Sequence, residues 1–584
     1  MAEATATKDS TGGKPGWRTL ARSLKNPKSG YMALFGFASG LPFALFLGTL
    51  YAWLTEAEVS VETMGVFSLI GLAYAFQFLW SPLLDKVNIP GLRRLGKRKQ
   101  WIAPMQLLLG IILVTMSLLD PKSQLGVFSL LAGIGAFASA TQDIAINAWR
   151  IDVADEEATI DILSTITQMG FRLAALVGGA LGLIIAERIG WPQTYIMMGG
   201  IMLAIGVAGL FAPDADVARR SAETIAADNE DLAELYRPGE IEPKMRNRAL
   251  LAVGLLWAWA IGTVLVFMIR SMTAEPDLRP NPTEFTATYG PLIIIATIVV
   301  PAFIAAWLAK MKNEKRHVIS HTAATFGAKD VTFADHLYRA LVLPLVEFVG
   351  RMGWSLVLIL ALVLTYRITD AIWGTFAYPF YLGELDYSGD DVAFASKFFG
   401  VGAVIAGLAL GGWLITVLGR MFTLTLGAAL AAATNLLYAD LAVGGAAMQA
   451  GSDLIGFTRL INFMAPFGSE GLARLTFTIM WENLAIGIAG AAYIAWLSSI
   501  VNKQYAAVQY ALLASLTLLV GTLGRGALGE MIEDRGYYYV FIFTALIGVI
   551  AVVLCILEWI REARAGAASG VVQPDATPEI ATGA

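Results

Sequence analysis

The chain has little of what soluble enzymes and disulfide-bonded proteins use. Cys555 is the single cysteine among 584 residues, so an internal disulfide framework or a cysteine-based metal site is excluded. The three histidines, His317, His321 and His336, fall in one polar stretch without tight ligand spacing, and we expect no metal site. The patterns His-Glu-x-x-His, Gly-x-Ser-x-Gly and the phosphate-binding loop are also missing. We therefore expect no enzyme activity, no cofactor and no ATP-driven step.

Charge is scarce as well. Only 15% of the residues are charged, while 57% are hydrophobic and the mean hydropathy is +0.64. This leaves too little polar surface to cover a soluble protein, so the composition indicates a polytopic membrane protein. The net charge is −5, and the basic residues lie in loops between apolar runs rather than on one face. Nucleic-acid binding is not supported.

Apolar runs of about 20 residues, the length that spans the hydrocarbon core, set the organisation of the chain. We count about fourteen, arranged as six, two and six, which predicts an all-α fold of two six-helix bundles plus two extra transmembrane helices. The predicted parts are a cytoplasmic tail (1–30), an N-terminal bundle (31–212), a cytoplasmic linker (213–247), an additional helix pair (248–310), a second cytoplasmic linker (311–352), a C-terminal bundle (353–560) and a disordered cytoplasmic tail (561–584). The stretch 442–472 is an insertion without a predicted role.

Lysine and arginine predict the orientation. Basic residues precede the first helix and fill the 85–100 and 310–352 loops, whereas the 383–391 loop is acidic. Cytoplasmic loops are rich in Lys and Arg, so both termini are expected in the cytoplasm. Within the second linker, 331–350 has apolar residues near helical spacing and predicts a helix lying along the membrane surface. A plain linker is the alternative, because Pro344 interrupts the pattern.

Six charged side chains fall inside the apolar runs, where each costs roughly 2.5 to 3.5 kcal/mol unless it faces a cavity, a partner or a substrate. They are Asp143, Arg172, Arg367, Asp370, Lys397 and Glu482. Three acids and three bases at this depth suggest a proton path beside an anion site, and therefore transport.

Each of these charges has a candidate role. Arg172, Arg367 and Lys397 are candidate anion contacts, with the arginines ranked first because their planar fork suits carboxylates. Asp143, Asp370 and Glu482 are candidate proton-coupling acids, and Glu482 is the favoured carrier. Two structural readings stay open: Arg367 and Asp370, three residues apart, form a neutralising pair, or the acids only brace neighbouring helices.

Uncharged side chains complete the candidate site. Gln142, Gln168 and Asn483 could bond sugar hydroxyls or amides, although for each alone a packing role is the stronger expectation. Trp373 and Trp481 lie next to intramembrane charges and could stack on a sugar face, with core packing as the alternative.

The loop after the second helix resembles the signature of the major facilitator superfamily in a stretched form. It reads Asp85-Lys86, then Gly91, Arg93, Arg94, Gly96, Lys97, Arg98 and Lys99. The resemblance implies gating roles for Asp85 and Arg98; a basic cytoplasmic loop arising from orientation alone is the alternative. Similar glycine patterns in the two six-helix sets predict duplicated halves that rock around a site between them.

Other segments resemble the AmpG-type muropeptide permeases of that superfamily. They are Gly40-Leu41-Pro42, Ala140-Thr141-Gln142-Asp143, Tyr366-Arg367-Ile368-Thr369-Asp370, Trp481-Glu482-Asn483 and Gln509-Tyr510-Ala511-Leu512. The resemblance implies a proton-driven importer of anhydromuropeptides in a bacterial inner membrane, with links to β-lactamase induction and no obligate protein partner. A permease for acyl-coenzyme A or siderophores and a non-transporting membrane sensor are the alternatives.

Overall fold

The computed structural model describes residues 22–59, 69–213, 235–273, 278, 280–319, 332–367, 376–377, 379–466 and 468–568. Nearly all of them are helical, and within these ranges the β-type pairing is limited to an isolated bridge between Ile241 and Val318. Eleven helices are long and apolar enough to cross a bilayer, or twelve if one bent pair counts as a single span. The predicted all-α polytopic fold is confirmed. Residues 60–68 and 368–375 of the two predicted bundles lie outside the described residues, so the expected total of fourteen stays a prediction.

The N-terminal bundle contains the first five of these spans. Its helical segments are α2 (Pro27–Ala44), η1 (Leu45–Thr49), α3 (Leu50–Glu56), α5 (Leu69–Ala75), η3 (Gln77–Leu79), α6 (Ser81–Lys86), α7 (Lys99–Ser117), α8 (Leu125–Val153), α9 (Ile160–Leu176), η5 (Val177–Leu181), α10 (Gly182–Ile189) and α11 (Trp191–Gly209).

Glycine lets α2 and α9 approach closely. A Cβ atom added to Gly36 would lie 2.4 Å from the carbonyl oxygen of Thr167, and one added to Gly170 would lie 2.6 Å from that of Ala33. Small residues at such crossings are how membrane helices gain packing without a hydrophobic driving force. This contact fixes the face of α9 that carries Thr167, Gln168, Phe171 and Arg172.

The additional helix pair is formed by α13 (Pro243–Thr273) and by α14 (Pro282–Ile294), which continues through η7 (Ile295–Val299) into α15 (Val300–Asn313). It packs on the N-terminal bundle through edge-to-face ring contacts of Phe76 with Phe285 and of Phe78 with Trp257. The two predicted extra spans are therefore present and packed against the N-terminal bundle.

The predicted surface helix is two short helices. α16 (Phe333–Leu341) and α17 (Leu343–Met352) meet where Pro344 occupies the first turn of the second, a position that proline tolerates. Arg246 of α13 forms a buried 3.2 Å ion pair with Asp335 of α16. α17 then turns by 106° into α18 (Ser355–Thr365), and this turn lies at the boundary expected between the second linker (311–352) and the C-terminal bundle (353–560).

The C-terminal bundle follows α18. Its segments are η8 (Pro379–Glu384), α20 (Gly389–Ala393), η9 (Phe394–Gly400), α21 (Val401–Leu418), α22 (Arg420–Ala442), α23 (Ala446–Leu454), α24 (Phe457–Met464), α25 (Leu472–Ser499), η10 (Lys503–Tyr505) and α26 (Ala506–Ala568). The insertion at 442–472 thus folds as two short helices. Gly536, with a φ of 78°, divides α26 into two helices, and Cys555 is buried.

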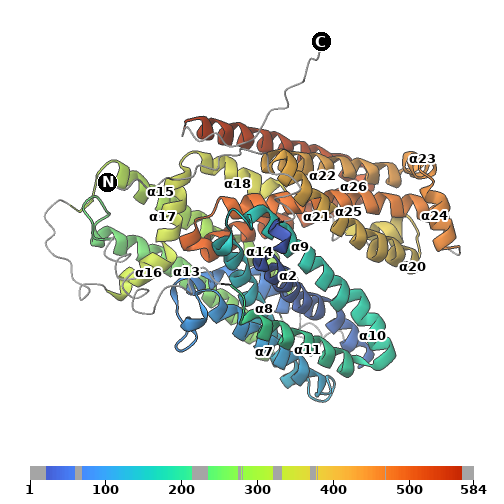
Figure 1. Cartoon of the computed structure of the whole chain (residues 1–584), viewed down its shortest axis with the longest axis horizontal. Coiled ribbons are helices and arrows are strands. Elements are labelled where there is room, and N and C mark those ends of the chain that lie inside the picture. The colour runs from blue at the N-terminus through green and yellow to red at the C-terminus, as the bar shows by residue number, and fades with distance from the viewer. Residues whose placement is uncertain are drawn as a thin grey trace, which may run out of the picture.

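The two bundles lie together at one end and diverge toward the other. In Figure 1, α10 and α11 of the N-terminal bundle point to the lower right, whereas α23 and α24 of the C-terminal bundle lie at the right edge. We call the end that holds residues 86–99, 153–160 and 499–506 the basic end. The end that holds 56–59, 118–124 and 384–391 is the acidic end.

Candidate functional site

A cavity of about 270 Å³ lies between the two bundles, and we call it the central pocket. Its wall is built by helices α2, α8 and α9 and η3 of the N-terminal bundle and by α25, α26 and the turn after α18 of the C-terminal bundle. The lining residues are Ser39, Gln77, Asp143, Ile144, Asn147, Thr167, Gln168, Phe171, Arg172, Arg367, Ile494, Ala507, Tyr510, Ala511 and Ala514. Both bundles therefore contribute to one site, as expected for duplicated halves.

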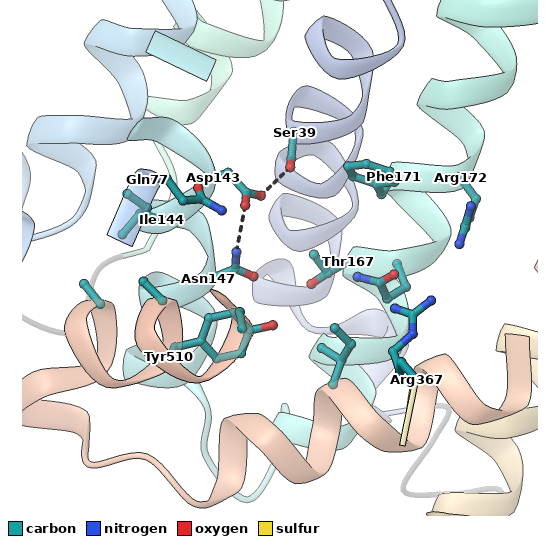
Figure 2. Close-up of a pocket in the computed structure, with 15 residues that line it drawn as sticks. Ser39, Gln77, Asp143, Ile144, Asn147, Thr167, Phe171, Arg172, Arg367 and Tyr510 are labelled. Atoms are coloured by element: carbon teal, nitrogen blue, oxygen red, sulfur yellow. Dashed lines mark hydrogen bonds between the residues drawn. The ribbon is translucent and has the colours of Figure 1, made fainter. Parts of the chain in front are cut away.

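Asp143 forms the acidic wall of the pocket. Its carboxylate accepts hydrogen bonds from Ser39 Oγ at 2.6 Å and from Asn147 Nδ2 at 3.2 Å. Asn147 lies one turn further along α8, so both side chains share a face. These uncharged donors orient the carboxyl group, which is partly exposed to the pocket (Figure 2).

Two arginines form the opposite wall. Arg172 comes from α9 and Arg367 from the turn that follows α18, and both side chains are half-buried. Figure 2 shows them across the pocket from Asp143, with Thr167 and Phe171 between. An anion with carbonyl or hydroxyl groups therefore finds cations at one side of the pocket and hydrogen-bonding groups at the other.

The predicted gating residues lie together at the basic end. Arg98 Nη1 is 2.7 Å from Asp85 and Arg98 Nε is 2.6 Å from Asp152, with the side chains of Arg98 and Asp85 fully buried. The remaining oxygen of Asp85 accepts a 3.0 Å hydrogen bond from the backbone N–H of Val508 in α26. The N-terminal bundle is thereby bonded to the first turn of a helix in the C-terminal bundle.

Further contacts join the bundles at the same end. Arg420 holds Asp161 in a bidentate pair at 2.7 and 3.1 Å. Lys503 Nζ donates to the carbonyl of Ala154 at 3.0 Å. Hydrogen bonds and ion pairs between the bundles thus cluster at the basic end, so this conformation is closed there.

Several predicted site residues do not line the pocket. Gln142 is buried and donates to the carbonyl of Ala38 at 2.7 Å, which joins α8 to α2. Asn483 donates to the carbonyl of Ile479 one turn earlier in its own helix at 2.8 Å. Each has the packing contact that the sequence left open as its alternative role.

Glu482 lies inside the C-terminal bundle. Tyr438 of α22 donates a hydrogen bond to its carboxylate, and the hydroxyl of Tyr438 is 2.7 Å from that of Tyr381. Sequence spacing does not pair these three residues, because the tyrosines fall on separate segments.

The remaining predicted contacts lie elsewhere. Lys397 is exposed in η9, and Trp481 is 42% exposed with its ring edge-on to Phe477. Asp370 and Trp373 lie outside the described residues.

Sequence reasoning missed part of the pocket. Ser39, Thr167, Phe171 and Tyr510 line it, yet none carries a charge that would have drawn attention at membrane depth. Asn147 was detectable, since it lies four residues after Asp143 on the same helical face. The central pocket is thus defined by two bundles, one acid, two arginines and a closed basic end.

Two helical bundles with a charged pocket between them form the architecture of a membrane transporter. The family model described as Major Facilitator Superfamily matches residues 31–371, more than half of the chain. The chain belongs to the major facilitator superfamily.

Individual proteins similar to this chain are named as permeases or transporters. The chain is 27% identical over 547 residues to the anhydromuropeptide permease of Escherichia coli strain K12, covering 92% of this chain and 82% of the permease. It is 24% identical to the putative transporter AmpG 4 of Rickettsia conorii, covering 88% of this chain and 92% of that protein.

Solved structures were matched as well. The proton:xylose symporter XylE has a TM-score of 0.49 at 10% identity, covering 92% of this chain and 94% of that chain. The human organic anion transporter MFSD10 has a TM-score of 0.48 at 13% identity, covering 92% and 99%.

Proposed function

We propose that this protein imports anhydromuropeptides across a bacterial inner membrane in symport with protons. The observation that carries the proposal is the central pocket, in which Asp143 lies across from Arg172 and Arg367 between two bundles. The similarity to a permease named for the same solute supports the substrate class. An anhydromuropeptide carries several carboxylates, hydroxyls and amides, which suits such a pocket.

The arginines are the proposed carboxylate contacts. Each presents a planar fork with five N–H donors, which can hold a carboxylate in two parallel hydrogen bonds. Gln168 lies one turn before Arg172 on α9 and is a proposed partner for an amide or a hydroxyl. Lys397, Asn483, Gln142 and Trp481 lie outside the pocket in this conformation, so the proposal does not depend on them.

Asp143 is the proposed proton carrier that faces the substrate. A carrier must be neutral in one state and ionised in another, and a carboxyl group that water and substrate reach in turn can meet this need. Glu482, the acid favoured on sequence alone, remains the second candidate, with Tyr438 as its partner. Substituting Asp143 and Glu482 separately distinguishes the two candidates.

Alternating access supplies the transport cycle. The basic end corresponds to the cytoplasmic side by the distribution of lysine and arginine, with both termini inside. A conformation closed at this end takes substrate from the outer side. Breaking the Asp85, Arg98 and Val508 contacts would then open the path inward.

Two alternatives use the same pocket. A permease for acyl-coenzyme A or a siderophore also needs cationic side chains, and a non-transporting sensor needs the arginines but no proton carrier. Both are distinguished from the importer by which solute accumulates and whether accumulation follows the proton gradient.

The test is uptake of radiolabelled anhydromuropeptide into proteoliposomes that contain the full chain, with and without an imposed inward proton gradient. We expect accumulation that requires the gradient and that excess unlabelled anhydromuropeptide abolishes. Binding without accumulation would favour the sensor. Absence of binding by folded protein would reject the substrate and direct the assay to acyl-coenzyme A and ferric siderophores.

A further inference from the structure

Arg150 is a buried cation that does not line the central pocket, although its charge acts on Asp143 of the pocket wall. It lies near the C-terminal end of α8, and its side chain has 0% exposure. Its Nη2 donates to Ser498 Oγ at 2.9 Å, while Nε and Nη1 have no hydrogen-bond partner within the part of the chain that the structure describes. Arginine stays charged in proteins, so burying it with unused donors is costly. A cost of this kind calls for a functional reason.

The contacts of Arg150 come from the other bundle. Ser498 is at the end of α25, and the ring of Tyr510 in α26 has its centroid 5.1 Å from the Arg150 guanidinium carbon. Tyr510 also lines the central pocket, so Arg150 lies directly behind the pocket wall. When the bundles separate at the basic end, α8 leaves α25 and α26, and Arg150 loses both contacts.

Arg150 also lies on the same face of α8 as Asp143 and Asn147, two polar residues that line the pocket. Asp143, Asn147 and Arg150 recur at helical spacing on α8, and seven residues of helix cover about 10 Å. Arg150 therefore lies about 10 Å nearer to the basic end than Asp143 does. One elongated solute can span this distance. A cation at this point lies on the way out of the pocket.

We propose that Arg150 is a second anion-binding residue, which takes a carboxylate of the substrate in the conformation that is open at the basic end. Separation of the bundles frees the whole guanidinium fork, and a carboxylate occupies it in place of Ser498 and Tyr510. The ligand class is a solute that bears at least two carboxylates, one for the pocket arginines and one for Arg150. The identity of that solute rests on the proposed function; the existence of the site does not.

A purely structural role is the competing explanation, in which Arg150 only holds the basic end closed. Ser498→Ala is the matched control, because it removes the same closing contact and leaves the guanidinium in place. Arg150→Gln removes the charge, and Arg150→Lys retains the charge without the fork.

The first readout is counterflow of radiolabelled anhydromuropeptide in proteoliposomes of known orientation, with the half-saturating concentration measured separately at each side. For Arg150→Gln we expect it to rise about tenfold or more at the basic end and to change less than about twofold at the acidic end. Arg150→Lys should be intermediate, and Ser498→Ala should resemble the wild type. Equal effects of Arg150→Gln and Ser498→Ala, or equal shifts at the two sides, would overturn the proposal.

The second readout needs no substrate. Ser498→Cys creates a thiol beside Arg150 in a chain whose native Cys555 is buried. As the basic end opens, a negatively charged thiosulfonate should react faster than a positively charged one, and adding Arg150→Gln should abolish this preference. No preference in Ser498→Cys would reject the anion site. A preference without anhydromuropeptide counterflow would keep the site and reject the proposed substrate.

Discussion

The carboxylate of Asp85 accepts a 3.0 Å hydrogen bond from the backbone N–H of Val508, which lies 423 positions later in the chain. Val508 is in the first turn of α26, where N–H groups have no partner within the helix and the helix dipole favours an anion. Arg98 holds Asp85 from the other side at 2.7 Å. One carboxylate thus connects a buried arginine of the first bundle with a helix start of the second.

Asp85→Asn should weaken closure of the basic end. The amide removes a charge from a buried pair, which typically costs about 3–5 kcal/mol, and it is a weaker acceptor for the Val508 N–H. We expect a cysteine at Ala507 to react faster with thiol reagents added at the basic end, and transport to fall. Asp155→Asn is the control, because Asp155 forms an exposed pair with Lys28 at the same end, worth at most about 1 kcal/mol. Unchanged accessibility in Asp85→Asn would contradict a gating role.

Asp143→Asn should separate transport from binding. An amide retains hydrogen-bonding capacity toward Ser39 but cannot take up and release a proton. We expect gradient-driven accumulation in proteoliposomes to be lost, while exchange of labelled for unlabelled anhydromuropeptide persists. Glu482→Gln is measured beside it. Loss of accumulation in Glu482→Gln alone would make Glu482 the carrier.

Arg367→Ala and Arg172→Ala should each weaken binding of a carboxylated substrate by about 10- to 100-fold, since a hydrogen bond to a charged group contributes about 1.5–3 kcal/mol. Equilibrium binding to purified protein measures this effect. Lys397→Ala removes a cation outside the pocket and is expected to change affinity by less than about threefold. Similar losses in all three variants would indicate a general electrostatic effect rather than a site.

Asp335→Asn should detach α16 from α13. Burial alone would raise the pKa of Asp335, but hydrogen bonds from Thr332 and Tyr236 and the charge of Arg246 outweigh it and hold that pKa below its usual value. A lowered carboxyl pKa gives stability that is present above the unfolded pKa of about 3.9 and is lost as the pH falls through the folded value. Hydrogen exchange of residues 333–341 should accordingly be protected to the same extent at pH 7 and pH 5.

In Asp335→Asn the protection should fall at both pH values, because Arg246 loses its buried partner. Glu314→Gln removes a carboxylate that forms exposed pairs with Lys310 and Arg316, and it should leave α16 protected. Protection of α16 that survives Asp335→Asn would mean that the ion pair of Asp335 with Arg246 is not what holds it.

The sequence predicted much of the fold because membrane spans are recognisable as apolar runs of about 20 residues. The two extra helices were found in this way, whereas the helical segment near 331–350 was found from the helical spacing of its apolar residues. The 106° turn between α17 and α18 lies where the sequence places the boundary between the second linker and the C-terminal bundle, but the size of its angle was not predicted, because hydropathy carries no information on direction. The break of α17 from α16 was detectable only as Pro344.

The sequence likewise identified some residues of the candidate site and not others. Charge at membrane depth identified Asp143, Arg172 and Arg367, which meet in one pocket although they come from three segments. Charge alone could not tell them from Glu482, whose environment depends on Tyr438 reaching it from another helix. Gln142 and Asn483 were ambiguous for the same reason, since an amide serves a carbonyl of its own bundle as readily as a sugar.

The bend between α17 and α18 also determines how deep Arg367 lies. If α17 lies flat at the membrane surface, the crossing begins only at Ser355, and the eleven residues of α18 rise about 16 Å. This is roughly half of a 30 Å hydrocarbon core, so the turn that carries Arg367 falls near the middle of the bilayer. A straight helix that began at Leu343 would have moved the same arginine about 18 Å further across. In that arrangement α17 would act as a spacer that sets the depth at which a solute meets the positive charge of Arg367.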